Sequence, residues 1–400
     1  MLEAPTRPSR SPLTIWPAVV AVMMGIFAIV TTEILPIGLL TPIASTFGIS
    51  DGTAGLTMTL PGLLAAVAAP SLTVVTARLD RRFMLCALML LLAVADFLAA
   101  AAPAYWVMMI SRALVGLTIG GFWSIGAGLA VRLVRREQAG TATAVIFSAV
   151  PLGSVLGVPV GTLIGHLAGW RMAFVVMGLL SLGVFVALLV LLPSLPAGQP
   201  TRLSALRDLL GDGGIRLALL ATVLIVLAHF GAYTYVTPFL LQVTQVSAGS
   251  VTTYLLVYGV AGIAGNFLAG AALSRHPRAT SMTAAALLAT ATALLPVAGG
   301  SMAGALTLLV IWGIAYGAVP VCSQTWFARS APHAPEAASI LFTSSFQATL
   351  SLGALAGGVV VDHISVAAVM GVAGTLAALT ASVLWFSLRR RPPSARPPAP

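Results

Sequence analysis

The chain has 400 residues, of which 59% are hydrophobic and only 8% are charged. So few charges cannot cover the surface of a soluble globular protein, and the composition therefore predicts an integral membrane protein with many spans. The net charge of +10 does not require nucleic acid as a partner, because the arginines lie between apolar stretches, where they set membrane orientation.

Apolar runs separated by Gly, Pro, Asp or Arg predict twelve transmembrane helices and no extramembrane domain. The expected spans are 15–44, 53–77, 83–102, 105–131, 139–165, 170–192, 215–241, 250–273, 279–299, 303–327, 335–360 and 364–388. Arginines cluster in alternate loops, so the positive-inside rule places both termini in the cytoplasm. The first run is too long for a cleaved signal peptide and is expected to remain as the first span.

The chain repeats itself with an offset of 196 residues, which places Thr41-Pro42 on Thr237-Pro238 and Gly157 on Gly353. The predicted fold is therefore all-α, with two pseudo-symmetric six-helix halves related by an axis along the membrane normal. The expected segments are an N-terminal tail (1–14), a first half (15–192), a linker (193–214), a second half (215–388) and a basic, Pro-rich tail (389–400).

Glu33 is the one charge within the first span, and Pro36 and Pro42 follow it. Each proline removes an N–H, so the carbonyls of Thr32 and Gly38 lose their helical partners, and such a helix is tolerated only against protein or a water-filled cavity. Loss of hydration disfavours the ionised carboxyl, as a proton carrier requires. A permanently neutral acid or a static partner of an arginine is the structural alternative.

The same offset of 196 residues carries Glu33 onto His229 in the seventh span. If the repeat is real, the two titratable groups occupy equivalent positions across the axis. A histidine changes charge near neutral pH, so His229 is a second candidate for proton coupling. A hydrogen-bonded core histidine is the alternative.

Arg112 is the single charge in the fourth span and shares a helix face with Gly116 and Gly120. A guanidinium stays protonated, so Arg112 must face protein, water or an acid. Asp96, in the third span, is about equally far from the turn that joins these spans. Both Asp96 and Glu33 are possible partners of Arg112. We favour Asp96 as the constant partner and keep it as a third proton-coupling candidate.

Two further motifs stand out. The fifth span carries Gly153, Gly157 and Gly161 at intervals of four, with Pro159 among them, which predicts a kinked helix with a close-packed face.

The loop between the second and third spans places one acid among three arginines, a pattern that fits a hydrogen-bonded latch between helix ends or simple orientation by charge. Its residues are Arg78, Asp80, Arg81 and Arg82.

These features together resemble the major facilitator superfamily over nearly the whole chain. The resemblance rests on the latch loop, RALVGLTIGG in the fourth span, GSVLGVPVG in the fifth, TTEILPIGLL in the first and VPVCSQTWFARSAP in the tenth. It is nearest to the drug/proton antiporter branch, which includes sugar and purine-ribonucleoside efflux proteins. The chain departs from that branch at Thr76, which replaces a glycine, and at Val158, which separates Gly157 from Pro159.

The resemblance implies a proton-coupled exporter of small amphiphilic or drug-like molecules in the bacterial inner membrane, working by alternating access. The expected partners are a small-molecule substrate, protons and the bilayer. The proton motive force would drive transport, with no cofactor, metal or enzymatic activity, and the chain would act as a monomer. The expected cavity, besides Glu33 and His229, is lined by Thr32, Trp123, Tyr233, Trp312, Tyr316 and Gln324.

Three alternatives remain open at this point. Within transport, the chain could be a dedicated sugar or nucleoside exporter, or a proton-coupled importer. In a different class, a membrane-embedded sensor would need no titrating pair.

Overall fold

The computed structural model describes residues 12–75, 79–126, 129–196, 208–273, 275–332 and 334–389. Within these ranges, 12 helices are long and apolar enough to span a membrane, which confirms the predicted all-α, twelve-span fold. The expected tails lie mostly outside the described residues, as do residues 197–207 of the expected linker.

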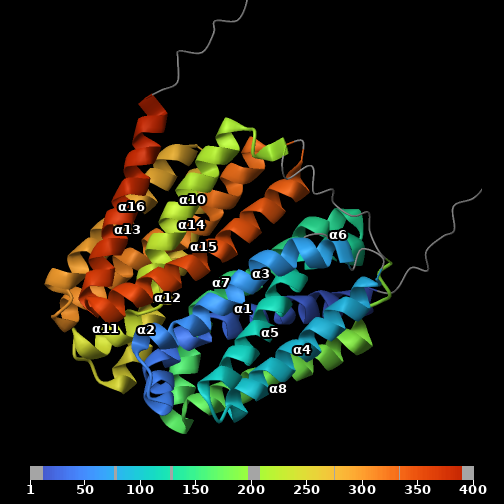
Figure 1. The fold of residues 1–400 in the computed structure, drawn as a ribbon. Coiled ribbons are helices and arrows are strands. Elements are labelled where there is room, and N and C mark those ends of the chain that lie inside the picture. The colour runs from blue at the N-terminus through green and yellow to red at the C-terminus, as the bar shows by residue number, and fades with distance from the viewer. Residues whose placement is uncertain are drawn as a thin grey trace, which may run out of the picture.

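The N-terminal half is built from long helices with short connections (Figure 1). Its elements are α1 (Pro12–Phe47), α2 (Asp51–Ala54), α3 (Leu56–Val75), α4 (Arg81–Ala101), α5 (Tyr105–Gly126), α6 (Leu129–Leu133), a 3₁₀ turn (Arg136–Gln138), α7 (Ala139–Ala168) and α8 (Trp170–Leu191). Those of the C-terminal half are α10 (Gly213–Tyr233), α11 (Val236–Gln242), α12 (Ala248–Leu273), α13 (Pro277–Ala298), α14 (Met302–Ser330), α15 (Pro335–His363) and α16 (Val366–Arg389).

The expected seventh span, 215–241, is divided into α10 and α11. The hydroxyl of Thr234 donates to the carbonyl of Phe230 at 2.6 Å, and the N–H of Tyr235 donates to Ala232 three residues back. Pro238 then has no N–H to offer the preceding turn. Local competition for backbone groups therefore interrupts the helix where sequence periodicity predicts one span.

The helix pairings repeat between the halves. In the N-terminal half α1 packs on α7, α3 on α5, and α4 on α8. In the C-terminal half the corresponding pairs are α10 with α15, α12 with α14, and α13 with α16. Figure 1 shows the two bundles side by side, blue to green and yellow-green to red. The predicted pseudo-symmetry is thus present in the packing.

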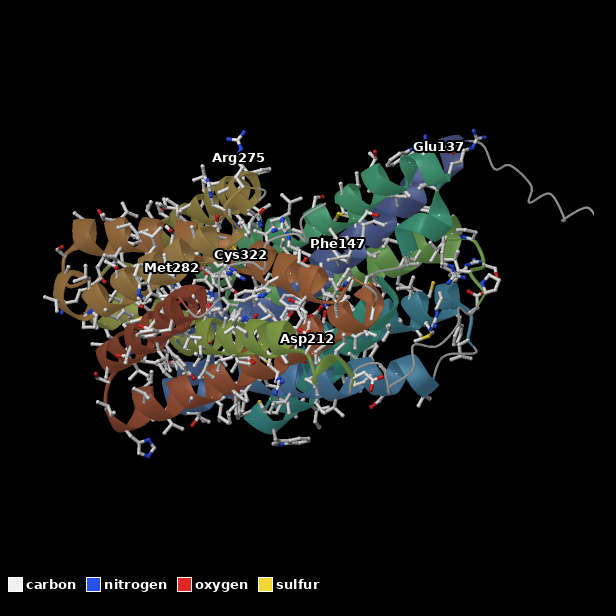
Figure 2. The ribbon with its side chains drawn as sticks, turned by 90° about the horizontal axis from the view of Figure 1, so that it is seen from above. Glu137, Phe147, Asp212, Arg275, Met282 and Cys322 are labelled. Carbon is white, nitrogen blue, oxygen red and sulfur yellow. The ribbon has the colours of Figure 1, made fainter. Side chains whose placement is uncertain are left out.

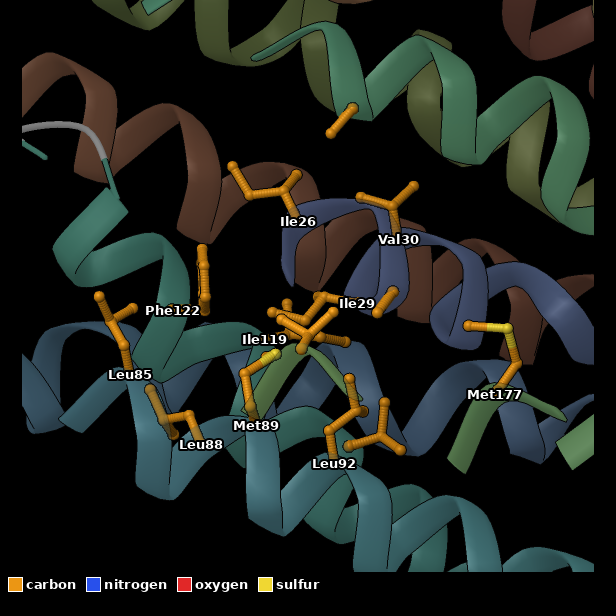
Figure 3. Packing of buried hydrophobic residues seen from close by; sticks show 14 of the residues in the cluster. Ile26, Ile29, Val30, Leu85, Leu88, Met89, Leu92, Ile119, Phe122 and Met177 are labelled. Atoms are coloured by element: carbon orange, nitrogen blue, oxygen red, sulfur yellow. The ribbon is translucent and has the colours of Figure 1, made fainter. Parts of the chain in front are cut away.

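A hydrophobic core fills the N-terminal half among α1, α4, α5 and α8 (Figure 3). Ile29, Met89, Leu92, Ile119 and Phe122 are all buried there and come from three of these helices. In a membrane the lipid is as apolar as these side chains, so the core adds close packing more than hydrophobic driving force.

The two halves meet mainly where α3 packs on α15 and α7 on α12. Near the centre of the interface the hydroxyl of Thr237 on α11 donates to the carbonyl of Ile37 on α1 at 2.9 Å. We call the end where α1 finishes and α2 begins the gate end. The other end, which carries the arginine-rich loops, is the basic end.

Candidate functional site

Glu33 lies on α1 at the interface of the halves and is only 7% exposed. Its Oε1 accepts a hydrogen bond of 2.7 Å from Nε2 of Gln347, a buried residue on α15. A buried carboxyl in the first half is therefore joined directly to the second half. Gln347 is not among the predicted site residues, and the offset of 196 residues places it on Pro151. Its only signal is that it is an amide within an apolar stretch.

Arg112 is fully buried, and all its hydrogen bonds go to main-chain carbonyls. Its Nε donates to Thr57 at 3.0 Å, both terminal nitrogens donate to Thr32 at 3.1 Å, and one also donates to the carbonyl of Glu33 at 3.0 Å. The carbonyls of Thr32 and Thr57 are free because Pro36 and Pro61, four residues on, have no N–H.

Asp96, the expected partner of Arg112, acts on its charge from nearby and does not accept a hydrogen bond from it. Among the described residues, neither Asp96 nor Glu33 brings a carboxylate oxygen within ion-pair distance of the guanidinium, although both acids lie close enough to act on its charge. The prediction that Asp96 and Arg112 lie at a similar depth on adjacent helices agrees with the short distance between these groups. It did not include the carbonyls that prolines leave without a helical donor, and these carbonyls are the acceptors that the guanidinium uses.

Asp96 is completely buried on α4. Its Oδ2 accepts from the hydroxyls of Thr32 at 3.2 Å and Ser181 at 3.4 Å, while Oδ1 has no hydrogen-bond partner. Thr32, expected to line the substrate cavity, is instead fully buried, and its side chain holds Asp96. The hydroxyl of Thr32 therefore donates its hydrogen bond to Asp96 and does not line a cavity.

Glu33, Asp96 and Arg112 form one buried cluster with two acids and a single cation. Ionising both acids would leave an excess negative charge in the interior, which is costly. Arg112 keeps its main-chain acceptors whichever acid is charged. The arrangement therefore favours one proton held within the cluster, on Glu33 or Asp96.

An aromatic cluster occupies the C-terminal half next to this site. His229 and Tyr233 on α10 and Trp312 and Tyr316 on α14 stack or meet edge to face, as predicted for one side of the cavity. Tyr258 on α12 completes the cluster, stacking on Tyr233 with centroids 4.6 Å apart. Tyr258 is not among the expected cavity residues, although its spacing of four from another tyrosine, at position 254, places both rings on one helix face.

His229 accepts a hydrogen bond of 3.1 Å at Nδ1 from the indole N–H of Trp312. An imidazole that accepts at Nδ1 carries its proton on Nε2 and is neutral. The ring is 1% exposed and stacked between aromatic rings. This geometry favours a neutral, stacking role for His229 over a proton-carrying one.

Two residues expected in the same cavity lie apart from this cluster. Trp123 is half-buried and packs against Phe147, 6.1 Å between ring centroids, inside the N-terminal half. Phe147 lies on α7 of the N-terminal half, whereas Tyr316 and Trp312 lie on α14 of the C-terminal half. Gln324 is exposed near the basic end of α14. Four of the six predicted cavity residues thus belong to one of two separate networks. Thr32 bonds Asp96 in the first network, and Tyr233, Trp312 and Tyr316 surround His229 in the second.

The glycines of α7 face α1 beside Glu33. A Cβ added at Gly157 would lie 3.2 Å from the Cα of Thr31, and one at Gly153 would lie 3.0 Å from Val30. Gly161 and Pro159 are buried on the same helix. The motif therefore brings α7 close to the segment of α1 that carries the titratable carboxyl.

At the basic end Asp80 joins the start of α4 to the segment after α8. It accepts from the main-chain N–H of Arg82 at 2.8 Å and of Leu195 at 3.1 Å, and from the hydroxyl of Ser194. Burial opposes ionisation, but these hydrogen bonds and the charge of Arg82 outweigh it and hold the pKa of Asp80 below its usual range.

The arginines of the same loop extend this connection. The guanidinium of Arg82 donates to the carbonyl of Leu189, and the main-chain N–H of Arg81 donates to Leu195 at 2.9 Å. Arg78 lies outside the described residues. The loop is therefore tied to the end of the sixth span of its own half.

At the gate end, two acids connect the halves. Asp362, at the end of α15, accepts from the hydroxyl of Ser50 at 2.7 Å and from the N–H of Gly52 at 3.0 Å. Asp51 accepts from Nε2 of Gln242, at the end of α11, at 2.9 Å. The sequence reading identified none of these contacts, because each joins residues about 190 or more positions apart.

A family model described as Major Facilitator Superfamily matches residues 20–350. The chain is 33% identical over 383 residues to "Transcription regulatory protein OpdE" of Pseudomonas aeruginosa, covering 95% of each chain. It is 30% identical over 379 residues to "Purine ribonucleoside efflux pump NepI" of Salmonella paratyphi A, covering 95% of this chain and 96% of that one.

Solved structures have the same fold. A bacterial homolog of the human lysosomal transporter Spinster, in an inward-facing and unoccupied conformation, aligns with a TM-score of 0.77 at 15% identity, over 96% of this chain and 100% of that one. The human organic anion transporter MFSD10 (TETRAN) aligns with a TM-score of 0.68 at 18% identity, over 94% and 100%.

Proposed function

Because the chain belongs to the Major Facilitator Superfamily, we propose that it is a proton-coupled efflux transporter for small amphiphilic or drug-like molecules. It works by alternating access in a bacterial inner membrane, with the basic end and both termini in the cytoplasm. The efflux pump among its relatives supports export. The proton motive force drives it without a cofactor, and one chain suffices.

The observation that carries this proposal is the hydrogen bond between Glu33 and Gln347 across the halves. Hydrogen bonds to an ionised acceptor are about twice as strong as neutral ones, so this contact stabilises the ionised carboxyl. It forms in a conformation whose halves are joined at the gate end by Asp362 and Asp51. Glu33 therefore releases its proton toward the basic end in this state.

Opening the gate end requires α3 to separate from α15, which draws Gln347 away from Glu33. Without that donor the buried carboxyl favours its neutral form and takes up a proton from the gate end. One proton moves inward per cycle while substrate moves outward. At about 150 mV a proton supplies about 3.5 kcal/mol, enough for a substrate gradient of a few hundred-fold.

The substrate class follows from the aromatic cluster of His229, Tyr233, Tyr258, Trp312 and Tyr316 beside Glu33. Aromatic rings bind planar or amphiphilic molecules by stacking and offer few charged contacts. A purine ribonucleoside, the cargo named for one relative, fits this chemistry, so a dedicated nucleoside exporter is the narrower version of the proposal. A sugar exporter is less favoured, since sugars need more hydrogen-bonding groups than this cluster offers. A proton-coupled importer is less favoured because the relative named above is an efflux pump.

A membrane-embedded sensor is a second candidate, favoured by the relative called a transcription regulatory protein. A sensor binds its ligand without moving it across the membrane. Purified protein in vesicles separates the two: a transporter produces substrate-dependent proton flux, whereas a sensor binds substrate with none.

The Glu33→Gln variant tests the proposal, because glutamine keeps the shape but fixes the group in a neutral form. We expect uphill export driven by a pH gradient to be abolished, while equilibrium binding and downhill exchange of a neutral substrate continue. A second variant, Gln347→Ala, keeps the carboxyl but removes the donor that favours its ionised form, so it should slow proton release and weaken coupling without abolishing it. Uphill export by Glu33→Gln at the wild-type rate would place the proton site elsewhere.

A further inference from the structure

A cavity lies at the basic end of the C-terminal half, away from Glu33 and the aromatic cluster. It has a volume of about 570 Å³ between the α12–α13 turn and the last turns of α14. Its lining residues are Leu273, His276, Pro277, Arg278, Ala279, Ser281, Cys322, Thr325, Trp326, Arg329 and Ser330. All belong to one half, so the cavity does not open and close with the interface between the halves.

The rim of this cavity is positively charged. Arg278 and Arg329 are both exposed at its edge, and His276 lies beside them. None of the lining residues is acidic. Within the described part of the chain neither guanidinium has a hydrogen-bond or ion-pair partner, so ten N–H groups are available to a ligand. The first turn of α13 adds the partial positive charge of a helix N-terminus.

The floor of the cavity is apolar. Leu273 and Cys322 are each 5% exposed and pack with Ala269, Ala284 and Ala318 in a small hydrophobic cluster. The half-buried indole of Trp326 forms a side wall. Figure 2 shows Cys322 within the bundle. A cationic rim above an apolar floor matches a ligand with one anionic group and one apolar part.

The equivalent loop of the N-terminal half shows what is missing here. Position 80 of the first half corresponds to position 276 of the second, and 82 to 278, by the offset of 196 residues. In the first half Asp80 binds the neighbouring segment and balances Arg82. In the second half His276 replaces the acid and makes no capping hydrogen bond. The second loop therefore lacks its internal anion.

We infer that this cavity binds a phosphate group carried on an apolar molecule. Arg278 and Arg329 contact the phosphate, and the apolar part lies against Trp326 and the floor. An anionic phospholipid is one source of such a group, and a soluble phosphate compound is the other. Phe267 and Leu268, on α12 just before the cavity, are 74% and 63% exposed, as expected for a wall that faces lipid.

The test uses the full chain purified from membranes, with retained phosphatidylglycerol counted by native mass spectrometry. A parallel titration with inorganic phosphate follows the unfolding temperature. Each arginine near a lipid phosphate is worth about fivefold in affinity, so Arg278→Gln with Arg329→Gln should retain about twenty-fivefold less phosphatidylglycerol. The control is Arg275→Gln, a neighbouring arginine that stands out from the surface in Figure 2 and does not line the cavity.

The outcomes separate the two sources. Loss of phosphatidylglycerol in the double variant but not in the Arg275 control supports a lipid. Phosphate-dependent stabilisation that the double variant lacks, without lipid retention, supports a soluble phosphate ligand. Equal loss in the Arg275 control, or no response to either probe in the wild type, overturns the inference.

A second measurement does not depend on removing the arginines. In a Cys86→Ala background Cys322 is the single cysteine, since the chain has only two. A small methanethiosulfonate reagent should label it through the cavity, and phosphatidylglycerol or phosphate should slow labelling at least threefold. Labelling at the same rate with and without either probe would show that the cavity is not their site.

Discussion

Arg112 and two prolines compensate for one another at the centre of the N-terminal half. Pro36 and Pro61 each leave a carbonyl without a helical donor, and an unpaired buried carbonyl is costly in a membrane. Arg112 needs acceptors that do not titrate and finds them in the freed carbonyls of Thr32 and Thr57. A permanent charge is thereby buried beside Glu33 without pairing with its carboxylate.

A double-mutant cycle tests this relation. Arg112→Met leaves two carbonyls unsatisfied and should cost about 2–6 kcal/mol of stability, taking about 1–3 kcal/mol for each. Pro61→Ala restores an N–H that can bind the carbonyl of Thr57, so the double variant should recover about 1 kcal/mol in detergent unfolding experiments. Pro70→Ala on the same helix is the control. Rescue by Pro70→Ala as large as that by Pro61→Ala would contradict the argument.

Asp80 gives a prediction with a definite pH dependence. Its pKa is lowered in the folded state, so its contribution to stability is complete above the ordinary range near 4 and is lost as pH falls through the depressed value. The difference in unfolding temperature between wild type and Asp80→Asn should therefore stay constant from pH 5 to 8. Transport should slow severalfold while substrate affinity is unchanged. A stability difference that vanishes by pH 6 would exclude an ionised latch.

At the scale of helices, each half contains one pair of helices that glycines bring into close contact: α3 with α5, and α12 with α14. Gly116 and Gly120 of α5 meet the backbone of α3, and Gly313 and Gly317 of α14 meet the backbone of α12. Gly265 of α12 faces α14, where an added Cβ would lie 2.8 Å from the Cα of Ile314. Backbone cannot move aside as a flexible side chain can, so these glycines set the helix separation.

Gly265→Ala should destabilise the protein by about 1–3 kcal/mol through overpacking. Gly270→Ala, five residues along the same helix, is the matched control because nothing lies within 4 Å of its added Cβ. Unfolding temperature and yield of folded protein from membranes provide the measurement. Equal behaviour of the two variants would show that α12 can move away from α14 without cost.

The fold was predictable because its signals are local and periodic. The length of each apolar run predicts a span, and the arginine-bearing loops predict on which side of the membrane each loop lies. The offset of 196 residues predicts the two halves. The site was only partly predictable. Glu33, Asp96 and Arg112 are charges in apolar stretches and therefore visible, but Gln347 and the true acceptors of Arg112 depend on which helices cross, and at which turn.

At the scale of the whole molecule, two kinds of contact join the halves. Gln347 binds the titratable Glu33 in the middle of the interface, while Asp362 and Asp51 bind across the gate end. The middle contact changes strength with protonation and is shielded from solvent. In the gate contacts the side chains of Ser50, Gln242 and Asp362 are exposed, and these contacts act as a fixed bias toward the closed gate. On the proposal that Glu33 carries the proton, protonation of Glu33 has to work against that bias to open the gate end.

Removing the bias should change the balance of conformations without changing the proton site. Asp362→Ala deletes the acceptor for both Ser50 and the N–H of Gly52, so the ratio of gate-closed to gate-open protein should fall about tenfold, which corresponds to about 1.4 kcal/mol. Spin labels at Ser45 and Val297, exposed at the gate end of different halves, report the distance between them.

We expect Asp362→Ala to add a population with a longer distance between these labels, and acid pH to increase it further by protonating Glu33. In the Glu33→Gln background the pH effect should disappear, while the shift caused by Asp362→Ala remains. His363→Ala is the control, since that exposed ring bonds to Val359 of its own helix and to no residue of the other half within the described ranges. If Asp362→Ala leaves the distances unchanged, or the pH effect survives Glu33→Gln, then the gate contacts and the central carboxyl are not the two devices that set the conformation.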